Sequence, residues 1–128
     1  MFMRNITLFL FWWFLFFSIS TSSADNEINL DIVENGEYDA LSDGLLIIRY
    51  LFGLTGDDLV SGILGSNSLV VEPVEIKSKL DSMRSHLDVD GNGSVDALTD
   101  GLLILRYLFG LRGDSLVTQV IGTGAARN

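Results

Sequence analysis

Cysteine is absent from this sequence, and histidine occurs once, as His86. Without cysteine the chain has none of the disulfides that often support small exported proteins, and a bound metal is one way to supply the missing stability. No nucleophile motif lies near His86, which we expect at the exposed end of a helix, so the sequence predicts that the protein is not an enzyme. Glycoside hydrolysis by two carboxylates is a remote alternative, because a chain this small offers no obvious substrate cleft.

Basic residues are also scarce. The chain has 8 Lys and Arg against 17 Asp and Glu, which gives a net charge of −9. This excess of negative charge argues against binding to nucleic acid or to an anionic membrane surface. It favours a cation as the partner.

The N-terminal residues have the layout of a secretory signal peptide. Arg4 precedes an apolar run over residues 6–17, and a stretch of small and polar residues follows over 18–24. We expect cleavage after Ala24 and a secreted, extracellular or periplasmic product. An uncleaved anchor is the alternative, but an apolar core of about a dozen residues is shorter than the roughly 20 residues that span a bilayer, so we expect no stable membrane anchor after cleavage.

The rest of the chain contains one unit twice. Residues 30–60 align with residues 87–117 at a constant offset of 57, and 22 of the 31 aligned pairs are identical. Each copy begins with a loop rich in Asp, Asn and Gly and continues into an apolar helix, expected over 43–52 and 100–109. Agreement of this kind indicates duplication of a structural unit.

The two copies are predicted to form one all-α domain over residues 25–121. Pro73 is expected to open a linker helix to about residue 86, because proline is tolerated in a first helical turn and apolar residues recur on one face of this segment. Residues 122–128 are expected to form a flexible tail.

The second loop, from Asp88 to Asp100, has the alternation of a calcium-binding loop. Oxygen-bearing side chains stand at loop positions 1, 3, 5 and 9, and the residue at position 7 offers a backbone carbonyl. Every second residue of such a loop points inward, and Ca²⁺ takes about six to eight oxygen ligands. The predicted ligands are Asp88, Asp90, Asn92, Ser94 and Asp96.

The closing acid of this loop is displaced by one residue. It usually stands at position 12, whereas here Thr99 holds position 12 and Asp100 holds position 13. Either the loop contains one extra residue and Asp100 ligates the ion, or Asp100 only stabilises the start of the following helix through the helix dipole. We favour ligation, because a site with four carboxylates suits a divalent ion better than a site with three and a gap in the coordination shell.

The first loop, from Asp31 to Asp43, is a weaker version of the second. It has Val33 where the second loop has Asp90, so one carboxylate is missing. The sequence therefore predicts two Ca²⁺ sites, of which the first is the weaker. Solvated turns are the alternative for any single Asp/Asn/Gly cluster, but two such loops occur in register. The predicted ligands of the first loop are Asp31, Asn35, Glu37, Asp39 and Asp43.

The paired loops, each followed by an apolar helix with Ile-Arg-Tyr or Leu-Arg-Tyr in its middle, resemble type I dockerin domains over about residues 28–117. The resemblance implies a relative of the EF-hand that folds around two calcium ions and docks onto a cohesin domain, a usage best known in extracellular polysaccharide degradation. Dockerins usually carry Ser or Thr at loop positions 10 and 11, where this chain has Ala and Leu in both copies.

The apolar helices are expected to provide the surface that binds a partner protein. Residues 45–54 and 102–111 are apolar on most faces, so they are expected to pack against each other and the linker helix. Aromatic surface left over from this packing offers a place for a cohesin-like partner. The alternative is a calcium-stabilised structural protein without a dedicated partner. The aromatic residues in question are Tyr50, Phe52, Tyr107 and Phe109.

Overall fold

A computed structural model describes residues 28–126, so the predicted signal peptide and the last two residues lie outside the described range. The described residues form helices and no strand, which confirms the predicted all-α class. None of these helices has both the length and the apolar character needed to cross a membrane. The elements in chain order are the π-helical turn η1 (Ala40–Gly44), α2 (Leu45–Leu51), α3 (Asp57–Val60), α4 (Pro73–Met83), the 3₁₀ turn η2 (Arg84–Leu87), the π-helical turn η3 (Ala97–Gly101), α5 (Leu102–Leu108) and α6 (Asp114–Val117).

Each apolar helix begins earlier than the sequence predicts. The π-helical turns η1 and η3 precede α2 and α5 directly, so helical backbone starts at residues 40 and 97 rather than at 43 and 100. The side chain of Asp39 caps the first of these turns, and that of Asp96 caps the second. Gly53 and Gly110, with φ of 85° and 87°, end the helices as predicted, because glycine adopts this left-handed conformation without strain.

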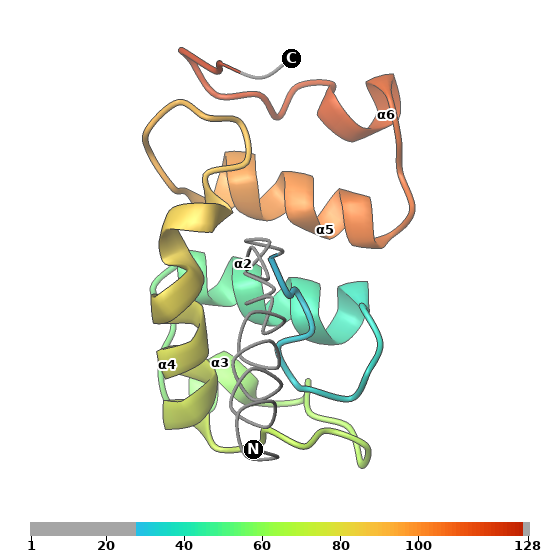
Figure 1. The fold of residues 1–128 in the computed structure, drawn as a ribbon, viewed down its shortest axis with the longest axis vertical. Coiled ribbons are helices and arrows are strands. Elements are labelled where there is room, and N and C mark those ends of the chain that lie inside the picture. Colours follow the sequence, from blue (N-terminus) through green and yellow to red (C-terminus); the bar gives the residue numbers. More distant parts are fainter. Residues whose placement is uncertain (1–27, 127–128) are drawn as a thin grey trace, which may run out of the picture.

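Helices α2 and α5 lie against each other in the centre of the molecule, with α5 above α2 in Figure 1. Glycine permits the approach at both ends. A Cβ atom on Gly44 would lie 2.8 Å from Cδ1 of Leu105, and one on Gly101 would lie 3.2 Å from Cγ1 of Ile48. Because glycine lacks a Cβ atom, the first turn of each helix can contact the middle of the other.

The linker helix α4 runs along one side of this pair (Figure 1) and covers α2 and α3. Its side chains Ile76 and Leu80 are fully buried in the main apolar core. The prediction placed this helix over 73–86; the α-helix ends at Met83, and the last turn tightens into the 3₁₀ turn η2. His86 is exposed in that turn, as predicted.

The arginines of the two apolar helices donate hydrogen bonds to backbone carbonyl oxygens. Nη1 of Arg49 donates to the carbonyl oxygen of Ser61 at 2.9 Å, and Nη1 of Arg106 donates to that of Thr118 at 2.9 Å. The one-turn helices α3 and α6 are thereby tied to α2 and α5.

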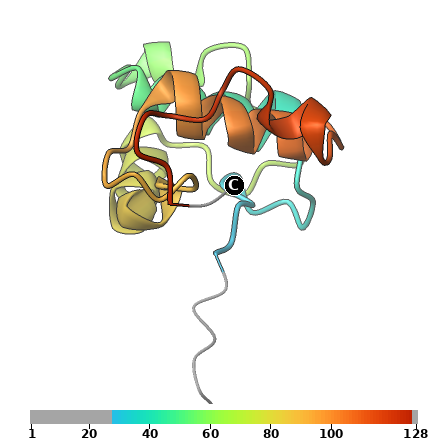
Figure 2. The ribbon, with the colours of Figure 1, turned by 90° about the horizontal axis from the view of Figure 1, so that it is seen from above.

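The equivalence of the two copies continues past residue 117. The amide of Leu69 donates to the carbonyl of Val33 at 2.9 Å, and the amide of Ala126, at the same offset of 57, donates to that of Asp90 at 3.0 Å. Residues 122–126, which belong to the expected flexible tail, thus make specific hydrogen bonds to the second loop, beside which the chain runs in Figure 2.

Candidate metal centre

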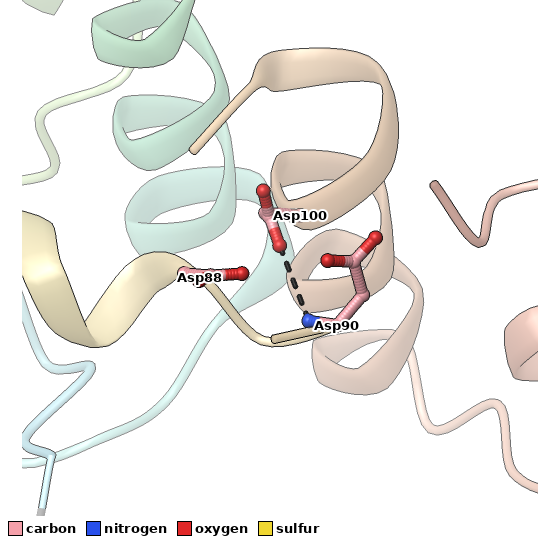
Figure 3. A group of neighbouring side chains, drawn as sticks. All are labelled: Asp88, Asp90 and Asp100. Atoms are coloured by element: carbon pink, nitrogen blue, oxygen red, sulfur yellow. Dashed lines mark hydrogen bonds between the residues drawn. The ribbon is translucent and has the colours of Figure 1, made fainter. Parts of the chain in front are cut away.

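The second loop is shaped by hydrogen bonds to its own aspartates. Asp88 accepts from the amides of Asn92 at 3.1 Å and Gly93 at 3.0 Å, and Asn92 accepts from the amide of Ser94 at 2.7 Å. Gly93 has a φ of 86°, which provides the predicted bend. These bonds curl the chain so that both Asp88 and Asp90 stand on the inner side, toward the start of η3 (Figure 3).

Asp100 points back into the loop from the helical turn. Its Oδ1 accepts from the amides of Val89 at 2.8 Å and Asp90 at 3.3 Å, and its Oδ2 accepts from the amide of Asp96 at 3.0 Å. Figure 3 shows the bond to Asp90 as a dashed line. Asp100 therefore does more than favour a helix start, because it fastens loop positions 2, 3 and 9 to the turn.

The π-helical turn explains how position 13 can face the loop. The amide of Gly101 donates to the carbonyl of Asp96, five residues back, at 3.1 Å. A π turn contains one residue more than an α turn. The extra residue of the loop is absorbed in η3, and the carboxylate of Asp100 reaches the loop despite its later position.

Asp88, Asp90 and Asp100 together form a carboxylate cluster, the only group of its kind among residues 28–126. One carboxylate oxygen from each lies within 4.8 Å of the other two. Oxygens at about 2.3–2.6 Å from a Ca²⁺ ion lie at most about 5 Å apart, so three oxygens with this spacing fit around one ion. Asp90 is 1 % exposed and Asp100 is fully buried.

No basic side chain balances this cluster within the described range. The ion pairs there join Lys77 to Asp81 and Lys79 to Glu34, away from the second loop. Buried carboxylates that lack a cationic partner are costly, and a bound cation removes that cost. The arrangement is suited to holding a hard divalent ion.

The other predicted ligands of the second loop lie outside the cluster. Asp96 caps η3, since its carboxylate accepts from the amides of Leu98 and Thr99 and, at 2.7 Å, from the Thr99 hydroxyl, which lowers its pKa below the ordinary value. Asn92 donates from Nδ2 to Oδ2 of Asp90 at 3.1 Å. Ser94 is exposed, and its amide donates a hydrogen bond to Oδ1 of Asn92.

The first loop repeats most of this geometry. Asp31 accepts from the amides of Asn35 at 3.1 Å and Gly36 at 2.8 Å, as Asp88 does at the equivalent positions. Asp43 is fully buried and accepts from the amides of Ile32, Val33 and Asp39. Burial raises the pKa of Asp43, and these three backbone hydrogen bonds counter part of the rise.

The first loop differs at the position of the missing carboxylate. Val33 is fully buried in the apolar core, and a lysine of α4, Lys79, lies against the loop. Its ammonium donates to the carbonyl of Asp31 at 2.5 Å and to Oε1 of Glu34 at 3.0 Å. A positive charge beside the loop and one carboxylate fewer both oppose tight binding of a cation; the ranking of the two loops stays a prediction.

Three predicted ligands of the first loop line a separate polar hollow. Asn35, Glu37 and Asp39 surround a space of about 220 Å³, together with residues of the connection after α3. Asp39 also caps η1 through bonds to the amides of Leu41 and Ser42. The structure thus divides the first-loop ligands between this hollow and the buried pair Asp31 and Asp43.

Two contacts of the loops were not predicted. One is the contact of Lys79 with the first loop, and the other is the bond of 2.8 Å from the amide of Gly122, a residue expected in the flexible tail, to Oδ2 of Asp90. A signal for the second was present, because Gly65 and Gly122 are identical at the offset of 57 and extend the repeat. No such signal marks Lys79, whose contact depends on how α4 packs.

No protein-family model, curated protein or solved structure matches this chain.

Proposed function

We propose that the protein is an exported calcium-binding module whose second loop holds one Ca²⁺ between Asp88, Asp90 and Asp100. The observation that carries the proposal is the cluster of these three carboxylates, two of them buried, without a basic partner among the described residues. The ion would join the loop to the start of α5. Folding and metal binding are then coupled, because the carboxylates repel each other until the ion is bound.

The donor set favours calcium over other metals. The cluster offers oxygen atoms only, and neither cysteine nor histidine stands in the loop, which disfavours zinc and copper. Mg²⁺ requires a near-ideal octahedron at about 2.0–2.1 Å, whereas Ca²⁺ accepts irregular shells of carboxylates, carbonyls and water. Remaining positions on the ion would be filled by water or by Asn92, the Ser94 carbonyl and Asp96. The first loop, with Asp31, Asp43 and Glu37, would bind a second ion more weakly.

The second part of the proposal is docking onto another protein, as the resemblance to dockerins implies. Leu41 and Leu98 occupy loop position 11, where dockerins usually carry Ser or Thr, and they are 62 % and 65 % exposed. Phe52 and Phe109 at the ends of α2 and α5 are also exposed. Equivalent exposed apolar residues on both copies support docking onto a protein partner, and the cohesin type rests on the resemblance alone.

Isothermal calorimetry of the exported form with CaCl₂ tests the calcium proposal. We expect a tighter event from the second loop and a weaker one from the first, with much less heat from MgCl₂. Thermal melting should shift upward in calcium relative to EDTA; at a free concentration about 100 times Kd, binding adds about 2.7 kcal/mol. Absence of heat at millimolar calcium would remove the proposal. A pull-down from the same secretome, with calcium and with EDTA, tests docking.

A further inference from the structure

The second copy carries an apolar groove that the first copy does not. Its volume is about 300 Å³, and it lies between α5, α6 and the start of the second loop. It is lined by Leu30, Val89, Asp90, Leu103, Ile104, Tyr107, Leu116, Val117 and Ile121. Asp90 is the single charged residue of this lining, so an apolar ligand is favoured.

The same surface of the first copy is covered by a helix. At the offset of 57, all the groove residues except Leu30 correspond to residues of the main core or packed against it. There the linker helix α4 inserts Ile76 and Leu80, both fully buried. The change in exposure is largest at the tyrosine, since Tyr50 is 8 % exposed and its equivalent Tyr107 is 48 % exposed.

Polar contacts at this surface also differ between the copies. The hydroxyl of Tyr50 donates to Oδ1 of Asp81, the residue after Leu80 on α4, at 2.7 Å. The guanidinium of Arg112 lies over the ring of Tyr107 at 4.0 Å, and it makes no ion pair within residues 28–126. Nη1 of Arg112 donates to the carbonyls of Tyr107 at 2.8 Å and Leu111 at 2.6 Å, which leaves its other nitrogens and the Tyr107 hydroxyl suited to a carboxylate. An arginine also lies over the tyrosine ring of the first copy, where Arg84 is 5.6 Å from the centre of the Tyr50 ring, so the copies differ in the acid and not in the arginine.

We infer that the groove of the second copy binds an amphipathic helix of a partner protein that resembles α4. The helix has two aliphatic side chains four residues apart, as Ile76 and Leu80 are, and an acidic residue directly after the second. The aliphatic pair lies on Leu103, Ile104 and Ile121, and the acid accepts from the hydroxyl of Tyr107 beside Arg112. This mode places an apolar helix face in a groove. The groove shares Asp90 with the proposed calcium site, so the two proposals are tested separately.

A labelled peptide with the sequence of residues 72–87 is the probe, because it contains the helix that fills the equivalent surface. Fluorescence polarisation with the exported form, residues 25–128, should show saturable binding. Ile121→Asp, in the groove, should weaken binding about tenfold or more, whereas Leu69→Asp, an exposed leucine elsewhere, should change it less than twofold. Tyr107→Phe should weaken binding about tenfold, the effect of one hydrogen bond to a charged group. For a peptide that carries Asp81→Asn, the Tyr107→Phe variant and the unaltered protein should bind with the same affinity.

Several results would overturn the inference. One is the absence of saturable binding at millimolar peptide. Another is a dimer in light scattering that Ile121→Asp converts to a monomer, which assigns the groove to a second copy. A third is binding that is insensitive to Ile121→Asp. Titrations in calcium and in EDTA, with the fold checked by circular dichroism, separate this test from that of the calcium proposal.

Discussion

The amide of Gly122 donates a hydrogen bond of 2.8 Å to Oδ2 of Asp90, which ties the segment after α6 to the second loop (Figure 2). No side chain fits at this glycine, because a Cβ atom would lie 2.6 Å from the same carboxylate oxygen and would clash with Nδ2 of Asn92. In the first copy, where Val33 replaces the aspartate, the amide of Gly65 donates to Oγ of Ser68 instead. The backbone bond to loop position 3 occurs in both copies, but the additional bond to a loop carboxylate occurs only in the second.

Gly122→Ala should therefore destabilise the protein. Because the added methyl group forces either the tail or the Asp90 carboxylate to move, we expect a loss of about 1–3 kcal/mol in the free energy of unfolding, measured by urea denaturation. The matched control is Gly65→Ala, where the new Cβ would meet only Oδ1 of Asn67, at 2.9 Å, the end of a flexible side chain. We expect less than about 0.5 kcal/mol there. Equal losses in both variants would show that close packing of Gly122 against Asp90 contributes no more to the free energy of unfolding than the environment of Gly65 does.

Asp90→Val gives the second loop the residue that the first loop has. Calcium affinity depends on the number of charged ligands, so the tighter event in calorimetry should weaken about tenfold or more. The control Asp58→Val removes the same charge from an exposed position of helix α3 and should leave both binding events unchanged. If the two variants bound calcium alike, Asp90 would not be a ligand.

Asp43 and Asp100 both stand at loop position 13. Comparing Asp43→Ala with Asp100→Ala distinguishes the structural role of this position from a role in metal binding. Each aspartate accepts hydrogen bonds from three loop amides and is fully buried, so both variants should lose about 3 kcal/mol or more in EDTA. Only Asp100→Ala should also abolish most of the rise in melting temperature caused by calcium. A calcium-induced rise that survives in Asp100→Ala would assign the tighter site elsewhere.

The parts of this structure that follow from local pattern could be predicted from the sequence. The offset of 57 predicted equivalent loops and helices, and the alternation of oxygens predicted that Asp88 and Asp90 face the same side. Spacing alone could not decide how Asp100 reaches the loop, since a π turn and an α turn place position 13 differently. Contacts that depend on tertiary packing, such as Lys79 on the first loop, carry no local signal.

The same limit applies to the two apolar helices. Their near-identical sequences predict equal burial, yet α4 covers α2 and leaves α5 partly open. Duplication therefore explains the local structure of both copies but not their different surroundings. The exposed Tyr107 and the buried Tyr50 are the clearest result of this difference.

Tyr50→Phe should reveal the contribution of the linker helix to stability. The Tyr50 hydroxyl donates to Asp81, whose pKa is held below its ordinary value first by Lys77 and then by Tyr50. A depressed carboxyl pKa stabilises the fold above the unfolded value of about 3.9 and loses this effect as pH falls through the folded value. At pH 7 the variant should unfold at a lower urea concentration than the unaltered protein.

The difference between Tyr50→Phe and the unaltered protein should shrink below about pH 4, as Asp81 becomes protonated in the folded state. Urea denaturation at a series of pH values between 3 and 8 measures it. Tyr107→Phe is the matched control, because its hydroxyl makes no hydrogen bond among the described residues, and it should change stability by less than about 0.5 kcal/mol at every pH. A loss in Tyr50→Phe that stayed constant down to pH 3 would show that the ionised Asp81 is not what the hydroxyl stabilises.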